Sequence, residues 1–237
     1  MRTFGLIGFP LTHSFSKKYF SEKFEIMGIS DSHAYELFEL EVASDFLDLF
    51  QSKPDLVGLN VTIPHKLAVI PCLDELDASA QKVGAVNVIK RLSSGKLKGY
   101  NSDYYGFKKS LIETLNGRNT ANLKALVLGY GGAAKAVIAA LEDLGIPYLI
   151  VSRSPENNQI SYTKTKEYLS THELIINCSP IGTYPNVEAS PAIEYNELTD
   201  KHVLMDLVYN PPLTQFLEQG KAKGATIQNG YQMLVYQ

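Results

Sequence analysis

One glycine-rich segment and four short polar segments of this sequence contain residues whose types and spacing suit ligand binding or catalysis. The glycine-rich segment, Gly129 to Ala134, fits the pattern G-x-G-x-x-G/A between a buried apolar run and an alanine-rich stretch. In this pattern one glycine permits a tight turn, another lets the backbone approach a pyrophosphate, and the following helix faces the anion with its N-terminus. The segment predicts a dinucleotide site formed by Gly129, Gly131, Gly132 and Ala133. The alternative is that the small residues only let a helix cross a strand closely.

The loop after the next strand indicates which dinucleotide is bound. NAD-binding proteins of this kind carry an acidic residue about 20 positions further on, where it bonds the ribose 2′-hydroxyl. This sequence instead has Ser152, Arg153 and Ser154. A planar guanidinium flanked by hydroxyls suits a 2′-phosphate, so NADP is the predicted cofactor. The alternative is that Arg153 is a solvated loop residue, since it is the one basic side chain in this loop.

Each of the four polar segments follows an apolar run and places hydroxyl, amide or charged groups at the end of an expected strand. They are His13 to Ser16, Asn60 to Lys66, Gly84 to Asn87 and Gly99 to Asp103. Ligands of open α/β sheets bind in the crevice outside the carboxyl ends of the strands. These groups suit a small polyhydroxylated acid. His13 and His65 have no neighbours at metal-ligand spacing, and we assign them no role.

The elements that must position these residues alternate between strands and amphipathic helices, which predicts an α/β fold in two domains. The first part predicts a parallel sheet followed by a strand pair, and the second a Rossmann-type, doubly wound sheet. Expected strands are 3–8, 34–39, 56–61, 84–89, 96–100, 124–128, 148–151, 174–177 and 203–207; expected helices are 16–27, 42–51, 103–115 and 133–144.

Composition excludes several classes of protein. With 237 residues, 45% hydrophobic and 20% charged, the chain has the composition of a folded two-domain protein. A net charge of −3 gives no basic surface for nucleic acid, and no apolar run reaches the roughly 20 residues that span a bilayer. The N-terminus lacks a signal-peptide pattern, and two isolated cysteines indicate neither disulfides nor a zinc site. We therefore expect a cytoplasmic protein, monomeric or homodimeric, with a small-molecule substrate and no metal.

A series of motifs in one order resembles the shikimate dehydrogenase family over nearly the whole chain. The motifs are S-x-S, N-V-T-x-P-x-K, G-A-V-N, N-x-D, G-x-G-G-A, Y-N-P and G-x-x-M-L-V-x-Q. The resemblance implies reversible, NADPH-dependent reduction of 3-dehydroshikimate to shikimate in the biosynthesis of chorismate and the aromatic amino acids. It also implies a substrate-binding and catalytic domain of residues 1–102 plus 231–237, and an NADP-binding domain of residues 103–230.

The resemblance also implies roles for individual residues. Ser14 and Ser16 would bind the substrate carboxylate. The ring hydroxyls would be held by Asn60, Thr62, Asn87 and Gln237, with Tyr209 also in the substrate cleft. Beside the cofactor would lie Asn177, Val208, Gly230 and Met233, although Met233 also fits as a core residue.

Lys66 and Asp103 would form the catalytic pair. Reduction of a ketone by hydride creates an alkoxide that needs a proton, which a lysine ammonium donates and takes back in the reverse reaction. A nearby carboxylate would orient the lysine and favour its charged form. The alternatives are a surface lysine for Lys66 and a helix cap for Asp103, and caps are likewise an alternative for Ser14 and Ser16.

The sequence departs from the family pattern in four places. Lys17 stands where proline is usual, and Ser102 stands where threonine is common. The loop at Arg153 has Pro155, Glu156 and Asn157 instead of the second arginine often seen in the family, which allows use of both NADP and NAD. The chain stops at Gln237, where the family's last helix would continue. Three other functions remain as alternatives: a quinate/shikimate dehydrogenase with relaxed NAD and NADP use, a non-catalytic metabolite-binding regulator, and a folate-linked dehydrogenase. Lys66 and Asp103 argue against the second, and the S-x-S and Y-N-P motifs argue against the third.

Overall fold

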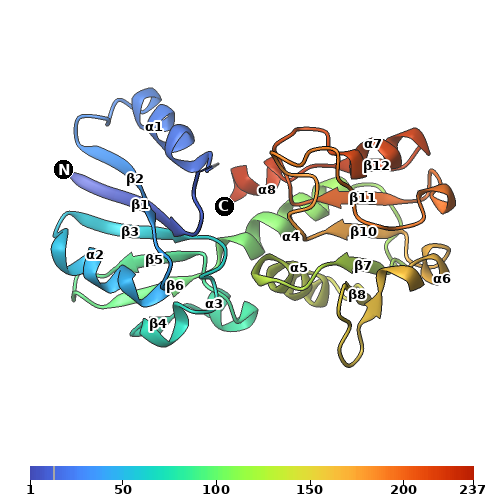
Figure 1. Cartoon of the computed structure of the whole chain (residues 1–237), viewed down its shortest axis with the longest axis horizontal. Helices are drawn as coiled ribbons and strands as arrows, with labels where there is room; N and C mark the ends of the chain where they lie inside the picture. The colour runs from blue at the N-terminus through green and yellow to red at the C-terminus, as the bar shows by residue number, and fades with distance from the viewer. Residues whose placement is uncertain (13) are drawn as a thin grey trace. The chain divides into compact units, whose positions relative to one another are not determined.

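The fold was analysed in a computed structural model that describes residues 1–12 and 14–237, so His13 lies outside the described residues. The chain divides into two compact units, Met1–Ser102 and Asp103–Gln237 (Figure 1). Residues 231–237, predicted to belong with the first domain, are grouped with the second unit because the last helix packs on the helix that opens that unit. Within the described residues, no helix is long and apolar enough to cross a membrane.

The first unit is a six-stranded mixed sheet in the order β2-β1-β3-β5-β6-β4. Its strands are β1 (Arg2–Gly8), β2 (His33–Glu39), β3 (Leu56–Val61), β4 (Glu75–Leu76), β5 (Val88–Arg91) and β6 (Leu97–Tyr100), and its helices are α1 (Ser16–Ile26), α2 (Phe46–Ser52) and α3 (Ala78–Val83). The three strands β1, β2 and β3 are parallel, as predicted. The β5–β6 hairpin runs antiparallel, also as predicted, and pairs β5 antiparallel to β3.

Alternation along β1 explains why helices cover both faces of this sheet. Successive strand residues point to opposite faces. Leu6 packs with Tyr35 of β2 and with partly buried phenylalanines of α1. Ile7, the next residue, belongs to a separate cluster with Phe46 and Phe50 of α2. Helices therefore cover both faces of the sheet, α1 on one face and α2 on the other.

The prediction of a strand from residue 84 was wrong at its start. Gly84 has φ +64° and ends α3 in the left-handed conformation, which glycine adopts without strain. Asp77 begins that short helix by accepting a hydrogen bond from the Ser79 N–H. The β5 strand begins only at Val88, so Asn87 lies just before the strand rather than within it.

The second unit is a six-stranded sheet in the order β12-β11-β10-β7-β8-β9, and all of its neighbouring strands are parallel. Its strands are β7 (Ala125–Leu128), β8 (Tyr148–Ser152), β9 (Ile160–Ser161), β10 (Leu174–Asn177), β11 (Val203–Asp206) and β12 (Thr226–Gln228), and its helices are α4 (Ser102–Thr114), α5 (Gly132–Asp143), α6 (Lys166–Leu169), α7 (Gln215–Ala222) and α8 (Tyr231–Tyr236). Numbered along this unit the order is 3-2-1-4-5-6, which is that of the Rossmann fold. The predicted doubly wound domain is confirmed.

The central strands of the second sheet are buried along their whole length, which explains their continuous apolar sequences. Every residue of β7, β10 and β11 is buried. Strands covered on both faces lose the alternation of polar and apolar residues. Strand order reverses between β7 and β10, so the loops at their carboxyl ends flank the position where this fold binds dinucleotides.

Candidate active site

The glycine-rich loop has the backbone geometry that the pyrophosphate prediction requires. Gly129, directly after β7, has φ +95°, a conformation that residues with a Cβ adopt only with strain. Helix α5 begins at Gly132, and its N-cap residue Gly131 brings no side chain to the helix end. A Cβ built on Gly131 meets no atom within 4 Å, so open space lies before the first turn. The first turn carries no acidic residue, which leaves the positive end of the helix dipole available to an anion.

The loop after β8 forms a tight turn around Arg153. Ser152 Oγ accepts a hydrogen bond from the Ser154 N–H at 3.3 Å and donates one to the Ser154 carbonyl at 3.2 Å. Arg153 between them is exposed. The turn thus presents the guanidinium to solvent at the carboxyl end of β8, which suits either a 2′-phosphate contact or the solvated alternative.

The ends of β10 and β11 are joined through a buried carboxylate. Asn177 is 0% exposed, and its Nδ2 donates to Asp206 Oδ1 at 3.0 Å. The same oxygen accepts the Val208 N–H at 3.0 Å. The Val208 carbonyl then accepts the Gly230 N–H at 3.1 Å. Three predicted cofactor residues are therefore brought together around Asp206, which the sequence analysis did not assign.

Burial dominates the electrostatics at this point. It raises the pKa of Asp206 to about 6, even though bonds from Thr214, Val208 and Asn177 act in the opposite direction. It also raises the pKa of the half-buried Tyr209. Tyr209 is therefore a neutral hydroxyl at physiological pH.

In the first unit, Tyr35 links two of the predicted substrate residues. Its hydroxyl, on a side chain 4% exposed, donates to Asn60 Oδ1 at 2.8 Å and is also hydrogen-bonded to Ser16. Burial raises the pKa of Tyr35, and the bond to Ser16 lowers it by less. Because Asn60 uses its oxygen to accept from Tyr35, its N–H₂ group is the part it offers to a ligand. The sequence analysis missed Tyr35.

The two serines of the S-x-S motif have different surroundings. Ser14 Oγ accepts the Ser16 N–H at 3.3 Å, so it satisfies a backbone group at the start of α1. The N-cap residue itself is Phe15 and makes no side-chain cap bond. Both serines are partly exposed. The capping alternative therefore holds in part for Ser14, and its ligand role stays a prediction.

Thr62 and Lys66 lie on the segment that follows β3, and both are partly exposed. The Thr62 N–H bonds the Ile7 carbonyl at 2.9 Å, and the Lys66 carbonyl accepts the Val86 N–H at 2.8 Å. His65 between them is buried, and its Nε2 lies 2.7 Å from the Leu40 carbonyl, to which it must donate. These bonds fix the segment on both sides of Lys66 and give His65 a structural role.

Asn87 is 5% exposed, and both ends of its amide bond Ser102. Its Oδ1 accepts the Ser102 N–H at 2.7 Å, and its Nδ2 lies 2.9 Å from the Ser102 hydroxyl, to which it donates. Asn87 therefore holds the residue at which α4 begins. Asp103 is the next residue, buried in the first turn of that helix, where a carboxylate is favourable.

The packing of α8 on α4 determines the positions of Met233 and Gln237. A Cβ built on Gly106 would lie 2.5 Å from the Met233 carbonyl oxygen and 3.0 Å from Gln237 Cγ, so α8 requires a glycine there. Gly106 is three residues after Asp103, which places Gln237 about one helical turn from that carboxylate. Met233 is buried, as its core alternative predicts.

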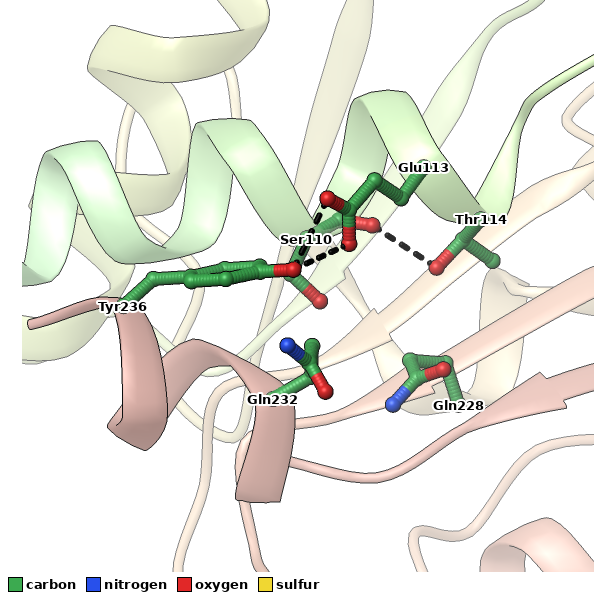
Figure 2. A pocket seen from close by; sticks show the side chains of 6 residues that line it. All are labelled: Ser110, Glu113, Thr114, Gln228, Gln232 and Tyr236. Atoms are coloured by element: carbon green, nitrogen blue, oxygen red, sulfur yellow. Dashed lines mark hydrogen bonds between the residues drawn. The ribbon is translucent and has the colours of Figure 1, made fainter.

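A small polar pocket lies beside this helix contact (Figure 2). It has a volume of about 230 Å³ and is lined by Ser110, Glu113, Thr114, Gln228, Gln232 and Tyr236. The Tyr236 hydroxyl lies 2.7 and 2.8 Å from the two carboxylate oxygens of Glu113. This contact ties the end of α8 to α4, immediately before Gln237. The lining includes none of the predicted site residues.

Lys66 and Asp103 belong to different units, so their pairing stays a prediction. The structure brings together Ser16 with Asn60, Asn87 with Ser102, and Asn177 with Val208 and Gly230. Within the described residues, no group of three or more histidine, cysteine or acidic side chains is arranged to hold a metal ion.

Residues 6–89 match a family model described as the shikimate dehydrogenase substrate binding domain. A shikimate dehydrogenase (NADP(+)) of Methanosphaera stadtmanae is 38% identical over 252 residues, covering 98% of this chain and 87% of that protein. Its counterpart in Clostridium beijerinckii is 38% identical over 253 residues, covering 100% of this chain and 89% of that protein. The crystal structure of shikimate 5-dehydrogenase from Thermus thermophilus, in complex with NADP(H) and shikimate, has a TM-score of 0.81 and 30% identity, covering 100% of this chain and 90% of that chain.

Proposed function

Because this chain belongs to the shikimate dehydrogenase family, we propose that it catalyses the reversible, NADPH-dependent reduction of 3-dehydroshikimate to shikimate. The observation that carries the proposal is the Ser16–Tyr35–Asn60 cluster, built on α1, β2 and β3 of the unit that the substrate-binding model matches. Burying the Tyr35 hydroxyl at the centre of this bonded polar cluster costs desolvation free energy, which a binding role explains.

The substrate carboxylate is bound by Ser14 and Ser16 at the start of α1. A helix N-terminus favours an anion, and α1 has no acidic residue in its first turn. The ring hydroxyls are held by Asn60, Thr62, Asn87 and Gln237. Asn60 offers N–H donors because Tyr35 occupies its oxygen.

Lys66 is the general acid of the reduction and the general base of the reverse reaction. NADPH, when bound by the second unit, would supply the hydride to the carbonyl carbon. The resulting oxyanion takes a proton from the Lys66 ammonium and becomes a hydroxyl group. The lysine is then neutral until solvent returns the proton. By the family resemblance, Asp103 would orient Lys66.

The second unit fits a nicotinamide dinucleotide. Gly129 to Ala133 would hold the pyrophosphate, since the loop combines a positive φ at Gly129 with open space before α5. Ser152, Arg153 and Ser154 would bind the 2′-phosphate. Asn177, Val208, Gly230 and Met233 would line the nicotinamide end of the site, and Tyr209 would contribute to the substrate cleft.

A second candidate function is quinate/shikimate dehydrogenase activity with relaxed use of NAD and NADP. The loop after β8 favours it, because Arg153 is exposed and is followed by proline and glutamate rather than a second base. A single exposed charge discriminates weakly between a 2′-phosphate and a 2′-hydroxyl.

The test is the absorbance change at 340 nm when the purified protein is mixed with shikimate or quinate and with NADP⁺ or NAD⁺. Turnover fastest with shikimate and NADP⁺ supports the main proposal. Turnover mainly with quinate or NAD⁺ supports the second candidate instead. Binding of nucleotide without turnover in any of the four combinations would contradict both and indicate a metabolite-binding regulator.

A further inference from the structure

Asp206 is the most deeply buried carboxylate at the carboxyl edge of the second sheet, and the groups that bond it are neutral. It is 1% exposed. Its Oδ1 accepts from Asn177 Nδ2 and from the Val208 N–H, each at 3.0 Å, and its Oδ2 accepts from the Thr214 hydroxyl at 2.6 Å. An ionised carboxylate accepts on both oxygens and donates from neither. Three donors point at Asp206, and this arrangement matches an ionised carboxylate.

The carboxylate also determines which way the Asn177 amide faces. Asn177 Oδ1 cannot point at another acceptor, so Nδ2 faces Asp206 and the oxygen faces the opposite side. There the oxygen accepts both the N–H of Ser179, at 3.1 Å, and its hydroxyl, at 2.6 Å. The loop after β10 is thus folded around a side chain whose orientation Asp206 sets.

The effect of Asp206 extends to the glycine-rich loop and to the loop after β11. A Cβ built on Gly129 would lie 3.4 Å from Ser179 Cβ, so Ser179 packs directly against the first glycine. On the other side, Val208 is bonded to Asp206 through its N–H and to Gly230 through its carbonyl. The loops after β7, β10 and β11 are neighbours in the sheet, and Asp206 connects all three.

We propose that Asp206 is a positioning residue whose ionised carboxylate holds these three loops in the arrangement that binds the nicotinamide nucleotide. It touches neither reacting atom and acts through Asn177 and Val208. The inference rests on the proposed function, because it assumes that the carboxyl edge of this sheet binds NADP(H). Protonation or removal of the carboxylate releases the Asn177 amide and loosens Ser179 and Val208 together.

A pH dependence follows from the buried position. Burial raises the pKa of Asp206 to about 6, so the carboxylate is ionised at pH 8 and protonated at pH 5. The other titratable groups influenced by its charge are Cys178 and Tyr195, whose pKa values are raised first by burial and then by Asp206. Both stay protonated over this range, so they do not contribute to the transition.

The test compares Asp206→Asn with the wild-type chain by calorimetric titration of NADP⁺ between pH 5 and 8. Asparagine keeps the shape but replaces an acceptor with a donor, and loss of bonds to a charged group weakens binding about tenfold or more at pH 8. At pH 5 the wild-type carboxyl is itself neutral, so the ratio of the two dissociation constants falls toward one. The 2′-phosphate of NADP⁺ also titrates near pH 6, but it does so with both proteins and cancels in the ratio.

The matched control is Asp200→Asn, which removes an exposed carboxylate from the same unit and leaves the dissociation constant unchanged at every pH. If Asp206→Asn does not fold, Thr214→Val replaces it as the test. Loss of the Thr214 donor moves the pKa of Asp206 further upward, so binding begins to weaken at a higher pH than in the wild type. Thr214→Ser keeps the hydroxyl and restores the wild-type profile.

Equal dissociation constants for Asp206→Asn and the wild type at pH 8, or a ratio that does not change with pH, would overturn the inference. The assay needs no turnover, so it separates this inference from the proposed reaction. If the protein binds NADP⁺ but does not oxidise shikimate, the proposed reaction is wrong, but the Asp206 binding test can still be interpreted. If the wild-type chain binds no nicotinamide nucleotide, both proposals fall.

Discussion

The two units build their predicted ligand sites from different parts of the chain. In the first unit the groups are side chains that bond one another, such as Tyr35 with Asn60, and Asn87 with Ser102. In the second unit the glycine-rich loop offers backbone N–H groups and a helix N-terminus. Hydrogen bonds around Asp206 hold the neighbouring loops at the carboxyl edge of the sheet. A side-chain site specifies the positions of individual hydroxyls on a ring. A backbone site recognises a phosphate, whose charge is the same in every dinucleotide.

The difference has consequences for which substitutions matter. In the first unit, removing one hydroxyl or amide leaves a buried partner unsatisfied, so an effect is expected at each member of the cluster. In the second unit the phosphate contacts depend on backbone conformation, so the glycines and the buried carboxylate that holds the loops matter more than exposed polar side chains. The following substitutions test this contrast, from the largest expected effect to the smallest.

Lys66→Met is expected to reduce kcat for shikimate oxidation about 10³-fold, because it removes the proposed proton-transfer group while keeping a flexible, unbranched side chain of similar volume. The dissociation constant for NADP⁺, which binds the other unit, should change little. Steady-state kinetics and calorimetric titration measure the two quantities. Lys90→Met, at an exposed position in β5 of the same unit, is the control and keeps full activity. A kcat within tenfold of the wild type would remove Lys66 from the proposed mechanism.

Gly129→Ala is expected to weaken NADP⁺ binding about tenfold, because alanine at φ +95° is strained by roughly 1–2 kcal/mol and the loop relaxes away from the phosphate position. Ser179 alone does not explain the effect, since its contact with the added Cβ would be an ordinary 3.4 Å. Gly145→Ala is the matched control: it also has a positive φ, +64°, but it follows α5 at its far end. It should lower the melting temperature without changing the NADP⁺ dissociation constant. Equal loss of affinity in both variants would show that strain lowers affinity wherever it is placed.

The elements of the fold differ in how far the sequence alone predicts them. The buried strands β7, β10 and β11 are continuous apolar runs, and the loop glycines have a recognisable spacing, so both the second sheet and its phosphate loop were predicted. The two-residue strands β4 and β9 are too short to leave a periodic signal. The helix α3 was missed because its six residues are followed by an apolar run that has the composition of a strand.

The supporting residues of the site were harder to predict than the ligand-facing ones. Tyr35 is a buried residue of β2 and has the pattern of a core aromatic residue. Its partner Asn60 is 25 positions away on β3, beyond the intervening strand β1. Asp206 follows three buried residues and bonds groups from two other segments. Such partners are determined by strand order and register, which no local pattern contains.

Tyr35→Phe is expected to raise the KM for shikimate about fivefold and to leave the KM for NADP⁺ unchanged. The ring keeps its packing against Phe20, with ring centroids 4.5 Å apart, but Asn60 Oδ1 loses its donor and the amide becomes free to turn. Initial-rate kinetics with each substrate varied in turn measure the effect. Tyr19→Phe, which removes a hydroxyl from α1 of the same unit, is the control. An unchanged KM for shikimate would assign the cluster a purely structural role.

Arg153→Gln has the smallest expected effect, an increase of about threefold in the dissociation constant for NADP⁺ with none for NAD⁺. The guanidinium is exposed, so solvent and salt screen its attraction to the 2′-phosphate and limit it to less than about 1 kcal/mol. Arg153→Lys keeps the charge but loses the planar fork, and an intermediate value would separate charge from geometry. The difference between Arg153→Gln and the wild type should shrink as NaCl is raised, because only a screened ionic contact responds in this way. A salt-independent difference, or one equally large for NAD⁺, would mean that Arg153 shapes the turn between Ser152 and Ser154 instead of recognising the phosphate.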